Sequence, residues 1–135
     1  MPIKGNNTFA EIFRRSKKIT AKNCYCYVVF APVAEDTTFK YAAVVRKKVV
    51  HKATCRNRVK RLLRVSIRQN IAYSADKDFF RHIKHFVVYW NAPLVHPKLL
   101  RLAEVSAGIT ELFAKADEFY RMRYEKRDKT KSAGE

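Results

Sequence analysis

The sequence predicts a two-layer α/β (α+β) sandwich, in which a mostly antiparallel sheet is covered by helices. With 135 residues, 47% of them hydrophobic, the chain can bury a core and is not a disordered basic tail. Helical and strand-like apolar periods follow each other in the order α-β-β-(β)-α-β-α, which suits one sandwich. We expect a single domain over residues 1–116 and a charged C-terminal extension over residues 117–135.

The first predicted element is a helix that follows a short polar arm. Thr8 and Glu11 have the spacing of a capping box, which marks a helix start. The apolar stripe of this helix consists of Phe9, Ile12 and Phe13, a pattern that core packing alone would explain. Four basic residues are expected to close the helix and lead into a connection: Arg14, Arg15, Lys17 and Lys18.

Two strands are expected next, and their closeness in the chain predicts a hairpin. Residues 23–30 alternate, so that Tyr25, Tyr27 and Val29 share one face while Cys24 and Cys26 lie on the other. Pro32 ends this strand, and residues 39–46 form the next. The chain has three cysteines without zinc spacing, so we expect small buried side chains and no metal site.

A basic helix over about residues 56–71 dominates the middle of the chain. Its apolar arc is Val59, Leu62, Leu63, Ser66 and Ile67. Its basic ridge is Arg56, Lys60, Arg64 and Arg68, at four-residue steps where like charges repel. No Asp or Glu occurs between Asp36 and Asp76 to relieve this repulsion. A helix that only keeps the protein soluble is the simpler interpretation, but the missing acids favour a polyanionic partner.

The overall charge indicates the same kind of partner. The formal net charge is +17 and the isoelectric point is near 10.1, which points to nucleic acid or an anionic membrane surface. No apolar run approaches the roughly 20 residues that a membrane-spanning helix needs. We therefore expect a cytoplasmic protein that binds no membrane.

The rest of the chain predicts an irregular segment, a strand and a last helix. Residues 73–82 are polar and irregular, residues 84–90 form a strong strand, and Pro97 is expected to open the last helix. The apolar stripe of that helix is Leu99, Leu102, Val105, Ser106, Ile109, Leu112 and Phe113. From about residue 117 the chain is charged and loses its period, and residues 126–135 are expected to fray.

The start of the basic helix resembles the bacterial ribonuclease P protein component. That family has an Arg-Asn-Arg motif continued as x-Lys-Arg-x-x-Arg, matched here by residues 56–58, Lys60, Arg61 and Arg64. The upstream Lys-Lys and Ala are matched by residues 47, 48 and 53. The family usually has a glycine in the turn before the helix, whereas this sequence has His51. The resemblance implies a left-handed crossover between the strands that flank the basic helix, where a right-handed one would be usual.

The resemblance also implies two RNA-binding sites. Residues that match the family's contacts with the catalytic RNA subunit are Arg56, Asn57, Arg58, Arg61, Lys47, Lys48 and Lys52. Residues that match its cleft for the single-stranded 5′ leader of precursor transfer RNA are Phe9, Phe13, Tyr25, Tyr27, Lys60 and Arg64. Plain packing is the alternative for the tyrosine pair.

The activity implied is removal of the 5′ leader by an endoribonuclease whose chemistry resides on the RNA subunit, with Mg²⁺ activating water there. We expect no catalytic residue, no bound metal and no small-molecule substrate on this chain. Asp76 and Asp78 come nearest to a carboxylate cluster that could hold catalytic metals, and they are typical of a polar loop. Two other classes remain open: an RNA-binding module such as a ribosomal protein or RNA chaperone, and a protein-only nuclease.

Overall fold

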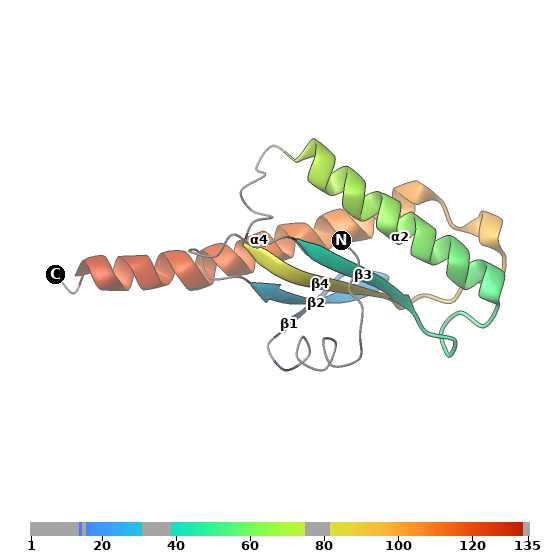
Figure 1. Cartoon of the computed structure of the whole chain (residues 1–135), viewed down its shortest axis with the longest axis horizontal. Coiled ribbons are helices and arrows are strands. Elements are labelled where there is room, and N and C mark those ends of the chain that lie inside the picture. Colours follow the sequence, from blue (N-terminus) through green and yellow to red (C-terminus); the bar gives the residue numbers. More distant parts are fainter. Residues whose placement is uncertain (1–13, 15, 31–38, 75–81, 134–135) are drawn as a thin grey trace.

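The protein forms a two-layer sandwich in which two helices cover one face of a four-stranded sheet (Figure 1). This computed structural model describes residues 14, 16–30, 39–74 and 82–133, with side chains through Arg123 in the last helix. The elements are β1 (Lys17–Thr20), β2 (Cys24–Phe30), β3 (Lys40–Val45), α2 (Ala53–Tyr73), β4 (Ile83–Trp90), the 3₁₀ helix η1 (Pro97–Leu99) and α4 (Leu102–Ala133). The predicted sandwich is confirmed. The expected first helix and the Asp76–Asp78 loop lie outside the described residues.

The strand order is β1-β2-β4-β3, so the predicted hairpin between residues 23–30 and 39–46 is wrong. β4 lies between these two strands, antiparallel to β2 and parallel to β3. The physical reason lies in β4 itself, where Phe86, Val87 and Val88 are all 0% exposed. Consecutive buried residues are typical of a strand whose two faces are both covered, which is the environment at the centre of a sheet and not at its edge. α2 connects the parallel pair, and the left-handed sense of that connection remains a prediction.

The structure contains a strand where the sequence predicted a helix end. Lys17–Thr20 forms β1, which pairs antiparallel with β2. Only Ile19 of its four residues is buried. One apolar residue gives no period, so this strand exists because β2 offers a free edge for pairing.

The core lies between the helices and the sheet. The buried residues of α2 are Cys55, Val59, Leu62, Leu63, Ser66 and Ile67, which confirms the predicted arc. α4 contributes Val105, Ile109, Leu112, Phe113 and Ala116. Phe86 of β4 stacks on Phe113 with ring centroids 4.6 Å apart. On the opposite face of the sheet, Val29 and Val87 form a smaller buried cluster.

The last helix starts later and continues further than predicted. Pro97 opens η1 instead, where the His96 ring accepts a hydrogen bond from the Lys98 N–H. Leu99 is 63% exposed, so it does not belong to the apolar stripe. α4 runs from Leu102 past residue 117 to Ala133, so the whole helix is about 48 Å long. Aromatic contacts hold this part of α4. The ring centroids of Phe30 and Phe119 are 5.8 Å apart, and those of His82 and Tyr120 are 4.6 Å apart.

All three cysteines are buried and free, as the sequence predicted for Cys24 and Cys26. Burial, together with the nearby Glu111 carboxylate, raises the pKa of Cys24 to about 11. Burial and the neighbouring Cys24 also raise the pKa of Cys26. Only the thiolate is nucleophilic, so these thiols are shielded in two ways.

We expect the native protein to react with a thiol reagent at least roughly a thousandfold more slowly than the unfolded chain, because labelling requires unfolding. The raised thiol pKa values stabilise the fold fully below pH 9, the ordinary thiol value, and this contribution is lost as the pH rises through about 11. Colorimetric thiol counting with and without guanidinium chloride checks the first point. Rapid labelling of folded protein would contradict it.

Candidate RNA-binding site

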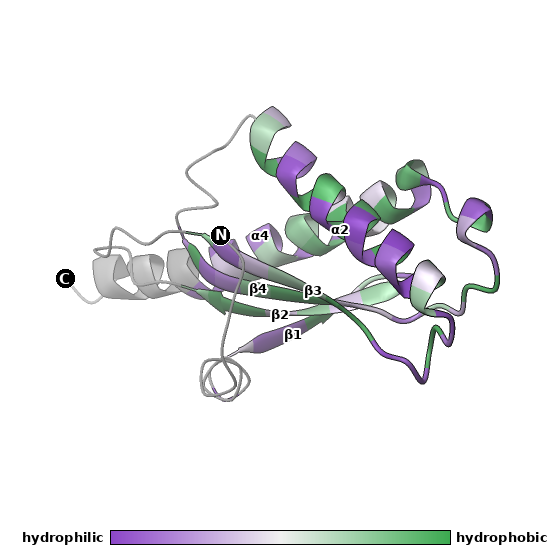
Figure 2. Ribbon diagram, turned by 45° about the vertical axis from the view of Figure 1, so that its right-hand side comes forward, coloured by the Kyte–Doolittle hydropathy of each residue, from purple (hydrophilic) through white to green (hydrophobic). Residues whose placement is uncertain are grey.

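A surface of α2 carries positive charge without any counter-charge on the helix. Hydrophilic residues recur along α2 in Figure 2, opposite the apolar arc that packs on the sheet. Asn57, Arg61, Arg64 and Arg68 are exposed and Lys60 is half-buried. α2 contains no Asp or Glu, so repulsion within this basic surface must be relieved by something outside the helix.

The connection between β3 and α2 extends this surface. Lys47, Lys48 and Lys52 are exposed, whereas Val50 is fully buried and anchors the connection to the core. The backbone N–H groups of Val49 and Val50 both donate to the Arg46 carbonyl at 3.0 Å, which closes a turn. Lys52 precedes α2 without a side-chain cap, and no acid lies in the first turn of the helix. The predicted lysines therefore lie exposed on the connection that leads into α2.

The two arginines of the Arg-Asn-Arg motif have partners inside the protein. Arg56 Nη1 donates to the carbonyls of Val50, at 3.0 Å, and His51, at 2.6 Å. Arg58 is half-buried and its Nη2 donates to the Leu100 carbonyl at 3.4 Å. His51 therefore lies in a connection that an arginine side chain holds in shape.

Three tyrosines form a cluster on the sheet face opposite the helices. Tyr25 and Tyr89 face each other across β2 and β4 and stack with centroids 5.1 Å apart. The Tyr27 ring is nearly perpendicular to both, and its centroid lies 6.0 Å from that of Tyr25 and 5.8 Å from that of Tyr89. Sequence reasoning found Tyr25 and Tyr27 but missed Tyr89. Alternation along β4 places Tyr89 on a face with Val87, but only the pairing of β4 with β2 brings it to the other tyrosines.

Two cations complete this tyrosine cluster, and the sequence analysis assigned neither of them to it. Lys18 Nζ lies over the Tyr25 ring, 4.7 Å from its centroid. Burial and the other two hydroxyl groups raise the pKa of Tyr89, while the nearby Arg46 guanidinium opposes that shift. Arg46 also accepts the turn hydrogen bonds of the β3–α2 connection through its carbonyl. This residue therefore links the tyrosine cluster to the start of α2.

The predicted leader-binding residues that the structure describes lie in two places. Phe9 and Phe13 lie outside the described residues. Tyr25 and Tyr27 lie in the tyrosine cluster, and Lys60 and Arg64 lie on α2, which packs over β3 on the other face of the sheet. A hairpin would have placed β3 beside β2. Because β4 intervenes, Tyr89 from β4 is the ring beside Tyr25 instead.

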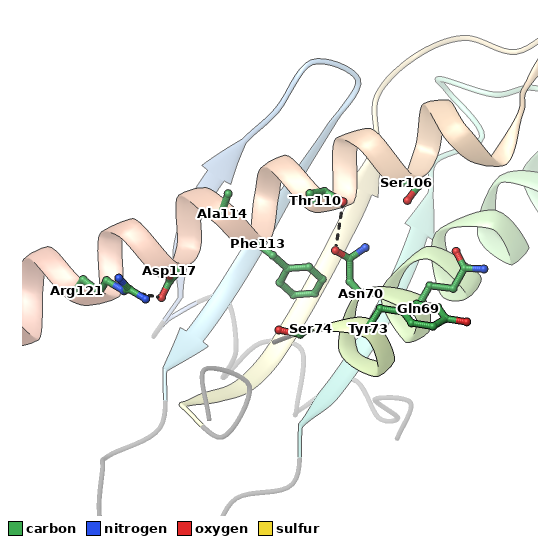
Figure 3. Close-up of a pocket in the computed structure, with 10 residues that line it drawn as sticks. All are labelled: Gln69, Asn70, Tyr73, Ser74, Ser106, Thr110, Phe113, Ala114, Asp117 and Arg121. Carbon is green, nitrogen blue, oxygen red and sulfur yellow. Dashed lines mark hydrogen bonds and ion pairs between the residues drawn. The ribbon is translucent and has the colours of Figure 1, made fainter. Parts of the chain in front are cut away.

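A separate groove of about 460 Å³ lies between the end of α2 and α4 (Figure 3). Within α2, Asn70 donates a hydrogen bond to the Ser66 carbonyl. Across the groove, it accepts a hydrogen bond from the Thr110 hydroxyl at 3.2 Å. The Asp117 carboxylate is occupied by Arg121 at 3.2 Å. The Asn70–Thr110 hydrogen bond joins the two helices, and the groove lies in the helix layer, away from the tyrosine cluster.

Within the described ranges, no three His, Cys, Asp or Glu side chains come together as a metal site would require. Neither described helix combines the length and the apolar character needed to cross a membrane.

Comparisons with known proteins identify the family. The family model described as ribonuclease P matches residues 1–117. The ribonuclease P protein component of Mycoplasma capricolum is 40% identical over 102 residues, which cover 74% of this chain and 90% of that protein.

Two solved structures share the fold at low sequence identity. The Staphylococcus aureus RNase P protein has a TM-score of 0.64 at 18% identity, covering 85% of this chain and 94% of that chain. The RNase P protein from Thermotoga maritima has a TM-score of 0.57 at 22% identity, covering 79% of this chain and 89% of that chain. The family match extends over the sheet, α2 and the part of α4 that packs on the core. This chain belongs to the ribonuclease P protein family.

Proposed function

We propose that this chain, as the protein component of ribonuclease P, binds the RNA subunit through α2 and holds the 5′ leader of precursor transfer RNA on the tyrosine cluster. The observation that carries the proposal is the acid-free basic helix together with a sheet face on which three tyrosines gather and Lys18 lies over the Tyr25 ring. The holoenzyme is an endoribonuclease, and we place its chemistry on the RNA subunit with Mg²⁺. We expect the complex to work in the cytoplasm.

Binding to the RNA subunit would use positive charge that no acid of α2 itself neutralises. Arg61 and the exposed lysines of the β3–α2 connection point away from the core, beside the amide of Asn57. Arginine binds a phosphate with two parallel hydrogen bonds, and the amide can bond to a base edge or a ribose hydroxyl. Each neutralised phosphate releases counterions, so this binding must weaken as salt rises.

Binding of the leader would use stacking, which tolerates any base. Tyr25 is covered by Tyr89 and by Lys18, so its ring orients the cluster more than it offers a free face. Tyr27 stands perpendicular to both neighbours, and we assign to it the stacking of a leader base. Lys18 and Arg46 would neutralise leader phosphates at the two sides of the cluster. Lys60 and Arg64, on α2, would contact leader phosphates outside the cluster.

The proposal predicts that activity requires both subunits. We expect the purified protein alone not to cleave precursor transfer RNA in Mg²⁺, and we expect it to raise the cleavage rate of an in vitro transcribed bacterial ribonuclease P RNA at low Mg²⁺. The measurement is single-turnover cleavage of end-labelled precursor transfer RNA with each component alone and with both together.

Two outcomes would contradict this assignment. Binding without any effect on cleavage would indicate an RNA chaperone or another RNA-binding module. Cleavage by nuclease-treated protein without RNA, lost in Asp76→Asn or Asp78→Asn, would indicate a protein-only nuclease.

A further inference from the structure

We propose that Arg56 and Arg58 serve RNA binding as positioning residues, which brace the start of α2 while Asn57, Arg61 and the neighbouring lysines contact the RNA. This inference rests on the proposed function and divides the work among the residues of that surface. It follows from where the two guanidinium groups already donate their hydrogen bonds.

Arg56 fixes the connection that carries the lysines. Both hydrogens of its Nη1 are directed at backbone carbonyls, those of Val50 and His51. Charge-assisted hydrogen bonds of this kind are stronger than neutral ones. Val50 is held from the other side by its fully buried side chain. The connection is therefore fixed from two directions, which sets where Lys47, Lys48 and Lys52 stand.

Arg58 fixes the opposite edge of the helix. Its Nη2 donates to Leu100, a residue only 5% exposed, in the segment that leads from η1 to α4. Its Nε is buried and has no hydrogen-bond partner among the residues that the structure describes. Two of the three guanidinium nitrogens are therefore turned toward the protein, and a positioning role uses the contact that Arg58 already makes.

Arg56 and Arg58 lie on either side of the exposed surface of α2. Residues two apart on a helix lie about 200° from each other around its axis, so Arg56 and Arg58 reach opposite edges. Asn57 lies between them on the outer side, and Arg61 follows it one turn later. The braces thus hold the outer residues at a fixed angle to the connection.

The experiment compares Arg56→Ala with Arg61→Ala as the matched control, using one in vitro transcribed bacterial ribonuclease P RNA. Affinity is measured over a range of salt, and amide hydrogen exchange is measured at Val49 and Val50, whose N–H groups close the turn. We expect Arg61→Ala to reduce the salt slope by about one and to leave exchange unchanged. We expect Arg56→Ala to keep the wild-type slope, to bind several-fold more weakly at every salt, and to raise exchange about tenfold or more.

Conservative variants sharpen the comparison. Arg56→Lys keeps the charge but not the planar group, so a positioning role predicts faster exchange at Val49 and Val50, whereas a phosphate contact predicts exchange at the wild-type rate. Arg58→Met keeps an apolar stem of similar length, which protects the fold, and a brace predicts an unchanged salt slope.

A reduced slope with unchanged exchange in Arg56→Ala, or a reduced slope in Arg58→Met, would overturn the inference. Hydrogen exchange needs no RNA, so it tests the Arg56 brace even if the proposed function fails. Failure of the proposed function would appear differently, as absence of specific RNA binding by the wild-type protein and by Arg61→Ala alike.

Discussion

Replacing Phe86 with alanine is expected to lower the free energy of unfolding by about 3–5 kcal/mol, enough to unfold much of the protein at ordinary temperature. Phe86 lies in the central strand, is 0% exposed and stacks on Phe113 of α4. Phe39 packs beside both rings, with its centroid 6.3 Å from that of Phe86 and 6.4 Å from that of Phe113. Removal of the Phe86 ring leaves a cavity where the sheet and α4 meet, and the rigid neighbours cannot fill it.

Guanidinium chloride unfolding followed by circular dichroism measures this effect. Leu99→Ala is the matched control, since Leu99 is equally apolar but 63% exposed and should change stability by at most about 0.5 kcal/mol. Equal shifts of the unfolding midpoint in the two variants would show that Phe86 is not a core residue.

Tyr27→Ala is expected to reduce the preference of the holoenzyme for precursor over mature transfer RNA by about 1–3 kcal/mol. A mature transfer RNA has no leader, so loss of a stacking platform weakens binding of the precursor alone. Tyr25→Ala should also weaken precursor binding, because Tyr25 orients Tyr89 and Lys18. Tyr27→Phe retains the ring and should behave as the wild type.

Paired binding isotherms for precursor and mature transfer RNA provide the measurement. Thermal unfolding must first show that each variant is folded. If both ligands lose affinity equally, or neither does, the tyrosine cluster is only a packing feature of the sheet.

Local periodicity was enough to predict β2, β3, α2 and β4, but it predicted neither β1 nor which strands are neighbours. The apolar arc of α2, including the small buried Ser66, could be read from spacing because a helix repeats over many turns. Pairing between strands depends on residues far apart, so proximity in the chain suggested a hairpin that does not form. The consecutive buried residues Phe86, Val87 and Val88 were the available signal that β4 is central.

The same limit applies to the site. Tyr25 and Tyr27 were found because alternation places them on one face, whereas Tyr89, Lys18 and Arg46 join them only through strand order. The hydrogen bonds of Arg56 and Arg58 end on backbone carbonyls, which leave no mark in the sequence. A basic motif therefore predicts charge at the surface but not which of its arginines faces outward.

The central position of β4 determines when the domain can fold during synthesis. Cys24 of β2 pairs with Trp90, and Val45 of β3 pairs with that same residue. Until this strand leaves the ribosome, β2 and β3 each have an unsatisfied backbone edge, and such edges invite pairing with other chains. Contacts between residues so distant in the chain also slow folding. The sheet therefore assembles late, after most of the chain has been made, and α4 must follow to cover its apolar face.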